Sequence, residues 1–267
     1  MSMPNVLSEY KKTVVFLGST NNNKTEIYAT GFLVSIQNII HLITAKHVIV
    51  DMKTGKIKDN NMHVFFNLKS KGIGVRPIKK IKKKLGINWM FHENAEIDIA
   101  VIPFGLDTSE DDVKVIPDKY FLTSERLFEL YDIFFLSYQP GIEPKDKISP
   151  IFRNGIISII NKEDRTFYID APAFPGNSGS PVFLKPSAIR FEENVISTGS
   201  DQLSGKFIGV IGQYIPYSEL AISTQTGRAR IVFEENTGLS KVWSVEYINE
   251  IIESDTFRKQ LDKIPTK

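Results

Sequence analysis

The sequence contains no cysteine. A chain without thiols cannot form disulfide bridges, bind a metal through thiolates, or use a cysteine as its nucleophile. Cysteine peptidases, zinc-finger-like modules and disulfide-stapled secreted domains are therefore excluded together.

Long apolar runs are also missing. No segment approaches the roughly 18 apolar residues of a membrane-spanning helix, and Glu9, Lys11 and Lys12 interrupt the N-terminal region before an apolar stretch develops. We therefore expect no membrane association. Together with the lack of cysteine, this favours a cytoplasmic location.

The chain carries little net charge, only +2 over 267 residues. One basic run stands out, and a solvated loop or strand edge is its expected structure. The alternative, a patch for nucleic acid or an acidic partner, lacks the interleaved aromatic side chains that stack on bases. We therefore expect no nucleic-acid partner. The run consists of Lys79, Lys80, Lys82, Lys83 and Lys84.

Metal and cofactor signatures are absent as well. The four histidines, His41, His47, His63 and His92, show no metal-ligand spacing, and no glycine-rich loop leads into a helix with a lysine. We expect the chain to work without a metal or a cofactor.

The sequence does contain many short β-prone runs between turn residues. Strands at this spacing predict an all-β sandwich or barrel, and 42% hydrophobic residues are ordinary for a globular chain. The runs are Thr13–Leu17, Tyr28–Ile36, Ile39–Thr44, Met62–Leu68, Ile97–Phe104, Ile133–Tyr138, Asn154–Ile160, Thr166–Ala171, Ser180–Leu184, Lys206–Tyr214 and Arg230–Phe233.

The C-terminal segment has a different periodicity. Val245, Ile248, Ile251 and Ile252 recur at three- and four-residue steps, which predicts a helix over residues 245–262. The acidic, turn-rich stretch 107–118 is the best candidate for a connector between two β subdomains, at 14–106 and 119–233.

Three segments place a reactive side chain at the edge of a β run. His47 ends TAKH, Asp98 opens the strand DIAVI, and Ser178 lies in GNSGSP. A serine hydroxyl is a poor nucleophile at neutral pH, so it requires a general base and a site for the oxyanion it creates. Histidine suits the first role, and an ionised aspartate can orient its ring. Gly176 and Gly179 permit a tight turn, so we expect the N–H groups of Gly176 and Ser178 to form the oxyanion hole.

These segments, in this order, resemble the histidine, aspartate and serine signatures of the chymotrypsin-like (trypsin-like) serine peptidases. The strand TGFLV before His47 adds to the resemblance, which runs from about Val14 to the terminal helix. It implies two antiparallel six-stranded β-barrels, with His47 and Asp98 from the first and Ser178 from the second. It also implies a serine endopeptidase that cleaves proteins or peptides through an acyl-enzyme.

In having an asparagine at position 177, the sequence resembles the bacterial HtrA-type and intracellular branches of this family. Zymogen-activated relatives carry an aspartate there, which pairs with a freed N-terminal amine. Because an amide cannot supply that charge, we do not expect activation by N-terminal clipping. Narrow specificity, a regulatory protein partner, or the long stretch 185–205 lying over the cleft would then restrain the enzyme.

The resemblance also implies how the substrate is bound. Gly238 would belong to the pocket for the side chain before the scissile bond. Pro172 occupies the position where an acidic residue would select lysine or arginine, so we predict a small or medium apolar side chain there. The edge strand that pairs with the substrate backbone would be Gly209, Val210, Ile211 and Gly212.

Three alternatives compete with this interpretation. A catalytically silent member of the same fold would bind peptides or proteins through its cleft. An HtrA-type chaperone-protease would add a PDZ domain, for which we expect no room after the barrel and helix. An α/β-hydrolase esterase would require the order serine, aspartate, histidine, which is not the order here.

Overall fold

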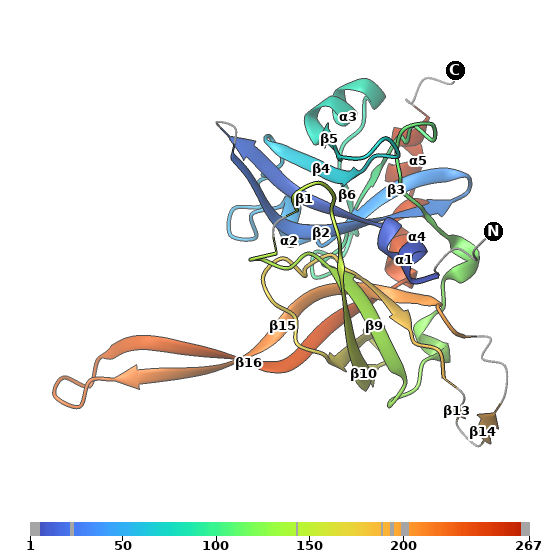
Figure 1. Cartoon of the computed structure of the whole chain (residues 1–267). Coiled ribbons are helices and arrows are strands. Elements are labelled where there is room, and N and C mark those ends of the chain that lie inside the picture. The colour runs from blue at the N-terminus through green and yellow to red at the C-terminus, as the bar shows by residue number, and fades with distance from the viewer. Residues whose placement is uncertain are drawn as a thin grey trace.

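The computed structural model describes residues 6–21, 24–142, 144–187, 189–192, 195–198 and 203–262. Figure 1 shows two β-rich bodies, one above the other, with a long two-stranded arm that leaves the lower body. The mostly-β class predicted from the sequence is therefore confirmed.

The upper body is a sheet of eight strands in the order β5-β4-β1-β2-β3-β7-β6, with β8 paired in parallel to β2. The resemblance implied a closed barrel of six strands for this half. Instead, β5 adds to the outer edge of β4 and β8 enters from the expected connector, and within the described residues the end strands β5 and β6 do not pair. The strands are β1 (Val14–Asn21), β2 (Lys24–Ile36), β3 (Ile39–Thr44), β4 (Met62–Asn67), β5 (Ile73–Pro77), β6 (Met90–Phe91), β7 (Ala100–Pro103) and β8 (Ile116–Pro117).

The lower body is a closed six-stranded barrel, as expected, in the order β10-β11-β16-β15-β12-β9. Its limits differ from the predicted 119–233. The barrel begins at Asp132, and its last strand continues past Phe233 because the stretch Leu239–Trp243 pairs with β11. The strands are β9 (Asp132–Ser137), β10 (Ile151–Asn161), β11 (Thr166–Asp170), β12 (Pro181–Leu184), β15 (Phe207–Ile222) and β16 (Ala229–Ser244).

A continuous apolar core joins the two bodies. One cluster of buried side chains contains Phe16 and Phe32 from the upper sheet together with Phe134 and Phe207 from the barrel. The rings of Phe32 and Phe207 lie 5.1 Å apart between centroids. Burial of large aromatic surfaces is the main favourable term in such packing, so it fixes how the bodies sit relative to each other.

Two helices replace the single helix predicted over 245–262. They are α4 (Glu246–Glu253) and α5 (Asp255–Leu261). Ser254 between them has an extended backbone, and its hydroxyl accepts a hydrogen bond from the backbone N–H of Phe257. This N-cap starts a second helix where the periodicity alone had suggested continuity. Among the described residues, no helix is long and apolar enough to span a bilayer.

The lysine run is helical, contrary to the predicted loop or strand edge. It forms α3 (Ile78–Leu85), whose Ile78 and Ile81 are buried while its lysines project outward. Lys82 also pairs with the buried Asp59 at 3.0 Å. Apolar anchors at a three-residue step therefore decide the structure of this segment. The shorter helical pieces are α1 (Val6–Lys12), α2 (Lys46–Ile49) and the 3₁₀ turns Asp118–Tyr120 and Ser124–Arg126.

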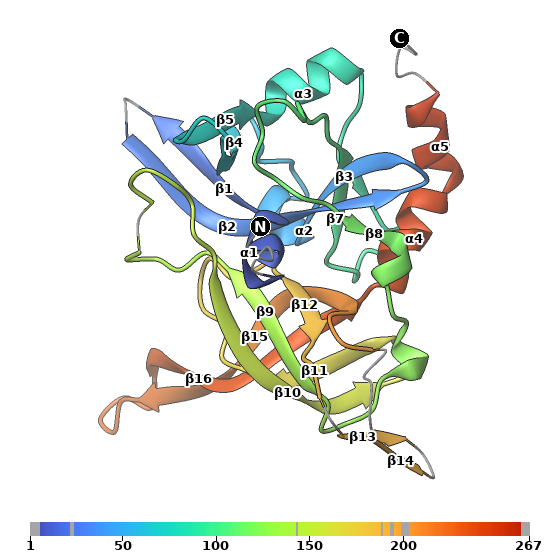
Figure 2. The same ribbon diagram turned by 45° about the vertical axis from the view of Figure 1, so that its right-hand side comes forward.

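The stretch 185–205 does not cover the cleft where the structure describes it. Strands β13 (Ile189–Glu192) and β14 (Val195–Thr198) form a small hairpin at the lower end of the barrel, away from α2 (Figures 1 and 2). Residues 188, 193, 194 and 199–202 of this stretch lie outside the described residues.

Candidate active site

His47 lies on α2, a single helical turn directly after β3. Buried Ala45 precedes this turn, and buried Val48 and Ile49 anchor it on the core of the upper sheet. The imidazole is left at the surface between the two bodies, with 35% of the side chain exposed. The apolar residues around His47 therefore set its position, and the ring remains accessible.

Asp98 holds the histidine at two points. Its Oδ1 accepts a hydrogen bond from the backbone N–H of His47 at 2.8 Å, and its Oδ2 lies 2.7 Å from the ring Nδ1. Buried Ile97 and Ile99 flank it, and only 14% of its side chain is exposed. A carboxylate that contacts both backbone and ring fixes the tautomer with the proton on Nδ1.

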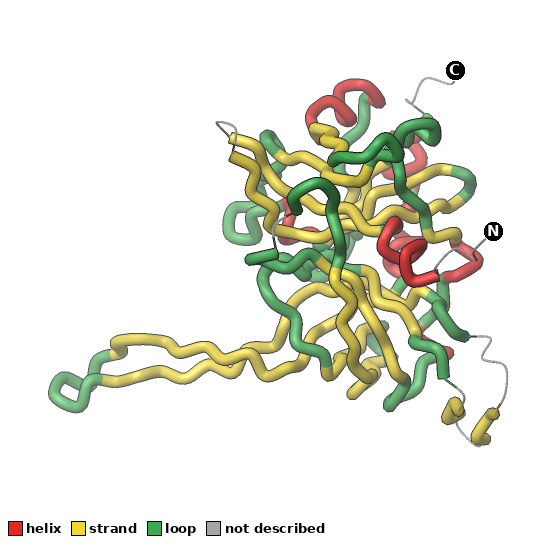
Figure 3. The backbone as a smooth tube through the Cα atoms, in the orientation of Figure 1, coloured by secondary structure: helices red, strands yellow, loops and turns green. Residues whose placement is uncertain are grey.

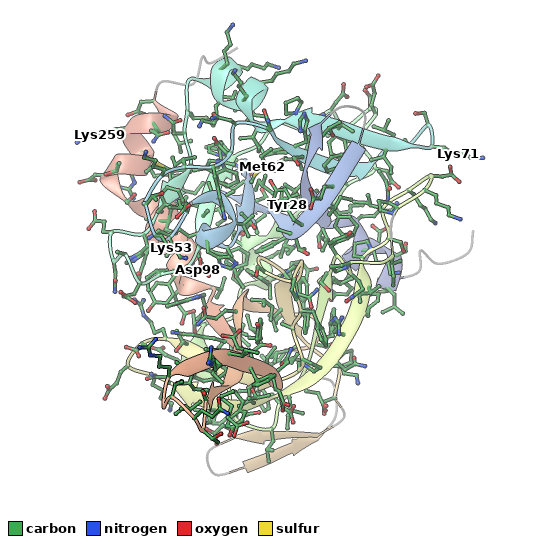
Figure 4. The ribbon with its side chains drawn as sticks, turned by 90° about the vertical axis from the view of Figure 1, so that its left-hand side faces the viewer. Tyr28, Lys53, Met62, Lys71, Asp98 and Lys259 are labelled. Atoms are coloured by element: carbon green, nitrogen blue, oxygen red, sulfur yellow. The ribbon has the colours of Figure 1, made fainter. Side chains whose placement is uncertain are left out.

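Figure 4 shows Asp98 at the junction of the two bodies, with Tyr28 and Met62 to one side on the upper sheet.

A glycine maintains the space beside the Asp98 carboxylate. A Cβ at Gly212 would lie 3.5 Å from Asp98 Oδ2 and only 2.8 Å from the Trp243 indole nitrogen. Gly212 thus allows β15 to approach the aspartate closely.

Ser178 completes the constellation from the lower body. Its Oγ lies 2.9 Å from His47 Nε2, the ring nitrogen opposite the one that contacts Asp98. The turn that presents it has Gly176 and Gly179 at positive φ, 96° and 82°. A Cβ at Gly179 would meet the Thr30 carbonyl oxygen and the Thr44 hydroxyl at 2.3 Å each, so only glycine fits there.

Two backbone donors beside Ser178 are unoccupied. Among the described residues, the N–H groups of Gly176 and Ser178 have no acceptor, whereas those of Asn177 and Gly179 donate to Phe174 and Ile211. Buried N–H groups in proteins are nearly always paired. Two free donors next to the Ser178 hydroxyl are chemically suited to bind a negatively charged oxygen.

The family follows from this region of the sequence. Residues 29–187 match the model of the trypsin-like peptidase domain. The chain belongs to the trypsin-like peptidase family.

Solved structures with the same fold are distant in sequence. An HtrA-type protease with a bound decapeptide matches with a TM-score of 0.53 and 15% identity, over 98% of this chain and 68% of that one. A serine endoprotease from Yersinia pestis matches at 0.51 and 13%, over 96% and 65%. The protease Anisep from Arthrobacter nicotinovorans matches at 0.51 and 13%, over 91% and 95%.

The chain spans 63% and 68% of the length of two HtrA-type structures that it matches. A comparison with curated protein sequences gave no match. These likenesses establish the fold of this trypsin-like peptidase domain.

Thr30 supports the turn that carries Ser178, and the sequence analysis did not predict this role. This fully buried hydroxyl donates to the Gly176 carbonyl oxygen at 2.7 Å and accepts from the Tyr138 backbone N–H at 2.9 Å. Its own carbonyl oxygen accepts from the Thr44 hydroxyl at 2.8 Å. Thr30 thereby connects the upper sheet to the turn of the lower body. A polar residue in the buried strand YATGFLV was the available signal.

Asn177 has a structural environment without charge. Its side chain is fully buried, its Oδ1 accepts from the Phe174 backbone N–H at 2.9 Å, and its Nδ2 donates to the Tyr138 carbonyl oxygen at 2.7 Å. Two backbone groups therefore satisfy the amide, and it braces the turn that carries Ser178.

The strand predicted to pair with the substrate backbone already has neighbours on both sides over most of its length. Gly209, Val210 and Ile211 are buried and have hydrogen-bonded neighbours on both sides, β12 and β16. The last pairing on the β12 side joins Ile211 to Ser180. Among the described residues, the free edge of β15 begins at Gly212. The sequence showed an apolar strand but not where its pairing ends.

The other two predicted binding residues, Pro172 and Gly238, lie on neighbouring segments of the barrel, at the ends of β11 and β16 that pair with each other. Gly238 in β16 has φ 85°, and its carbonyl oxygen accepts from the Ala171 backbone N–H. Pro172 is exposed. Asn236 connects these segments, because its Nδ2 donates to the Ala173 carbonyl oxygen and its Oδ1 accepts from the Gly238 N–H.

Two cavities meet at His47. One, of about 510 Å³, lies on the Asp98 side and includes Asn94, Gln213 and Lys241 in its lining. The other, of about 570 Å³, includes Tyr28, Met62 and Ser178. Within the described ranges, no three His, Cys, Asp or Glu side chains are grouped to hold a metal ion.

Proposed function

We propose that the chain is a serine endopeptidase with His47, Asp98 and Ser178 as its catalytic residues. The observation that supports this most directly is the unbroken set of contacts from Asp98 through the ring of His47 to Ser178 Oγ, at 2.7 and 2.9 Å. Nucleophile, base and orienting carboxylate occur here in mutual hydrogen-bond reach.

The reaction follows from these contacts. His47 Nε2 takes the proton of Ser178 as Oγ attacks the carbonyl carbon, and the carbonyl electron pair moves onto oxygen. The N–H groups of Gly176 and Ser178 stabilise this oxyanion, and one such donor contributes about 3 to 4 kcal/mol to the transition state. His47 then returns the proton to the leaving amine, which leaves an acyl-enzyme.

Deacylation repeats the sequence with water. Nε2 deprotonates the water as its oxygen attacks the ester carbon, and the proton then passes to Ser178 Oγ as it leaves. Asp98 stays ionised throughout, holding the imidazole and stabilising its protonated form. Each step uses groups already within reach.

We further propose that the substrate lies across both cavities at His47. Its residues before the scissile bond would pair with the free edge of β15 from Gly212 to Tyr214, in the cavity that Gln213 lines. The residues after it would leave past Tyr28 and Met62. Because Pro172 brings no charge, we retain a small or medium apolar side chain before the scissile bond. A peptide-library profile dominated by lysine and arginine would contradict this preference.

Covalent labelling tests the proposal. A fluorophosphonate probe should label the wild-type protein, and the label should vanish in Ser178→Ala and fall sharply in His47→Ala. Circular dichroism should show that both variants are folded. If folded wild-type protein fails to react with the probe, the alternative function holds, in which the chain is a catalytically silent module that binds peptides in its cleft. Restraint by a regulatory partner and a cytoplasmic location stay predictions.

A further inference from the structure

The arm of the lower body exposes apolar side chains on a projecting hairpin. It comprises residues 215–222 of β15 and 229–236 of β16, and it extends away from the barrel as two paired strands (Figures 1 and 3). An isolated two-stranded hairpin is marginally stable in water. Four large apolar side chains of the arm are more than half exposed: Ile222, Ile231, Val232 and Phe233, at 58%, 58%, 57% and 56%.

The two edges of the arm differ. The β15 edge contains Pro216, which has no N–H to donate to another strand. The β16 edge has no proline between residues 229 and 236. Among the described residues, β16 pairs with β11 only from Leu239 onward, so its edge along the arm has no neighbour. An edge without proline, whose central residues Ile231, Val232 and Phe233 are apolar, can pair with another strand.

The sequence along this edge is self-complementary. Arg230, Ile231, Val232, Phe233 and Glu234 are consecutive and exposed. If two such strands pair antiparallel about Val232, each Arg230 lies opposite a Glu234, each Ile231 lies opposite a Phe233, and Val232 meets its own copy. Directly opposite residues on antiparallel strands contact each other on the same face.

We propose that two copies of this chain associate through their arms, with the β16 edges paired antiparallel about a two-fold axis at Val232. This is an isologous contact, in which the same surface serves both partners. It joins β15-β16 of one copy to β16-β15 of the other in a four-stranded sheet. The catalytic proposal is independent of it.

The pairing within each arm extends the complementarity across the sheet. Leu220 lies opposite Val232, so the two copies would form one apolar row of Leu220, Val232, Val232 and Leu220. On the other face, Glu219 lies opposite Phe233 and Ala221 opposite Ile231. The Phe233 of one copy would there contact the Ile231 of the other. Both faces of the joined sheet are then apolar at their centre.

Register favours a second copy over another occupant. Moving the axis by one residue to Phe233 would place Ile231 opposite Glu235 and Arg230 opposite Asn236. The axis at Val232 alone matches apolar residues with apolar ones and opposite charges with each other. A substrate or foreign strand would not require this symmetry.

A cysteine cross-link tests the register. The chain has no cysteine, so each introduced thiol is unique. Val232→Cys should form a disulfide-linked dimer under mild oxidation, because paired Cα atoms lie about 4.5 to 5.5 Å apart, within disulfide range. Leu220→Cys is the matched control. Its two copies would be three strand spacings apart, about 14 Å, and should not cross-link.

Charge exchange tests the partner. Sedimentation or light scattering should show a wild-type dimer, and Arg230→Glu or Glu234→Arg should each raise the dimer dissociation constant at least about tenfold, since each creates like charges directly opposite. An equimolar mixture of the two variants should dimerise again, because each supplies the charge that the other lacks. Fluorophosphonate labelling at Ser178 should be unchanged.

Several results would overturn the proposal. These are a monomeric wild-type protein at about 100 μM, equal cross-linking of Val232→Cys and Leu220→Cys, or a dimer that neither charge variant weakens. A monomer whose arm gains protection from amide exchange only when a peptide substrate is added would assign the edge to substrate instead.

Discussion

At the scale of single residues, the turn that carries Ser178 depends on a hydroxyl from the other body. Thr30 Oγ1 donates to the Gly176 carbonyl oxygen. This contact fixes the orientation of Gly176, whose own N–H is one of the two proposed oxyanion donors. The same oxygen accepts from Tyr138. In the proposed reaction, Thr30 is therefore a positioning residue that would act through Gly176.

Thr30→Val keeps the shape of the side chain but removes both hydrogen bonds. We expect kcat to fall about 10- to 100-fold with little change in KM, since the lost orientation matters mainly in the transition state. We also expect a loss of about 1 to 3 kcal/mol in stability, because a buried donor and acceptor are left unpaired. Steady-state kinetics and urea unfolding measure both effects.

Thr25→Val is the matched control for this substitution. Thr25 is exposed on the same strand, and its hydroxyl contacts only Thr20 at 3.4 Å among the described residues. It should change neither kcat nor stability appreciably. If Thr30→Val raised KM and left kcat unchanged, Thr30 would serve substrate binding rather than the turn.

His41 gives a prediction on pH. It is fully buried beside the ring of Phe257, and burial lowers its pKa to about 4 from the ordinary value of 6.5. Between pH 6.5 and 4, His41 therefore carries a proton in the unfolded chain but not in the folded chain. The contribution of a neutral His41 to stability is present above pH 6.5 and is lost as the pH falls through this window, by on the order of 3 kcal/mol in all.

Replacing His41 with leucine should remove this loss. Urea unfolding at pH 7.5 and 4.5 should show a smaller decrease in the free energy of unfolding for His41→Leu than for the wild type. Comparing two pH values within each protein separates the titration from any packing change caused by leucine. An unchanged decrease would show that other groups cause the acid sensitivity.

At the scale of elements, the turn carrying Ser178 is fitted against the upper sheet. A Cβ at Gly179 would overlap the Thr30 backbone, and φ is 82°. Gly179→Ala should therefore cost more than about 3 kcal/mol and abolish labelling at Ser178, because strain and overlap add. Thermal unfolding and probe labelling measure this.

Gly227→Ala provides the comparison for that prediction. Gly227 also has a positive φ, 64°, but nothing lies within 4 Å of its Cβ position at the end of the arm. Only strain of about 1 to 2 kcal/mol is expected there, with labelling unchanged. Equal effects of the two substitutions would mean that backbone strain alone, and not the contact with the upper sheet, governs the turn.

The elements that the sequence predicted correctly are those whose pattern is local. The runs Ile39–Thr44 and Thr166–Ala171 are bounded by turn residues, and they form β3 and, up to Asp170, β11. The prediction of a loop or strand edge for the lysine run was wrong because it rested on the five charges. The burial of Ile78 and Ile81 makes the segment a helix. The Ser254 cap was also overlooked, since the apolar periodicity continues on either side of it.

Features that depend on pairing partners could not be read in the same way. The position of the free edge on β15 depends on Ser180 binding Ile211, which no local pattern reveals. The arm depends on β15 continuing beyond Tyr214 through Pro216, a residue that usually ends a strand. By contrast, three distinctive short motifs predicted that His47, Asp98 and Ser178 would lie together, and the structure brings all three within hydrogen-bond reach in a chain of contacts.

At the scale of the whole molecule, the two proposals assign separate roles to the two bodies and to the arm. Thr30 and the shared aromatic core join the bodies around the site. The arm beyond Pro216 and Asn236 contributes mostly exposed side chains. The proposed catalytic site should thus tolerate loss of the arm, whereas the proposed dimer should not.

Deleting residues 217–235 and joining Pro216 to Asn236 through Asn-Gly tests this separation. Pro216 and Asn236 are paired in the hairpin, and a two-residue Asn-Gly loop closes such a pair in a type I′ turn. The hydrogen bond from Asn236 to the Ala173 carbonyl oxygen is retained beside the site. We expect labelling at Ser178 within about threefold of wild type, because the turn that carries Ser178 and the contacts of Thr30 and Asn177 that support it are untouched. Sedimentation should show a monomer at concentrations where the full chain is a dimer. Loss of labelling in a shortened protein with an unchanged melting temperature would place the arm within the catalytic machinery, and a persistent dimer would place the interface elsewhere.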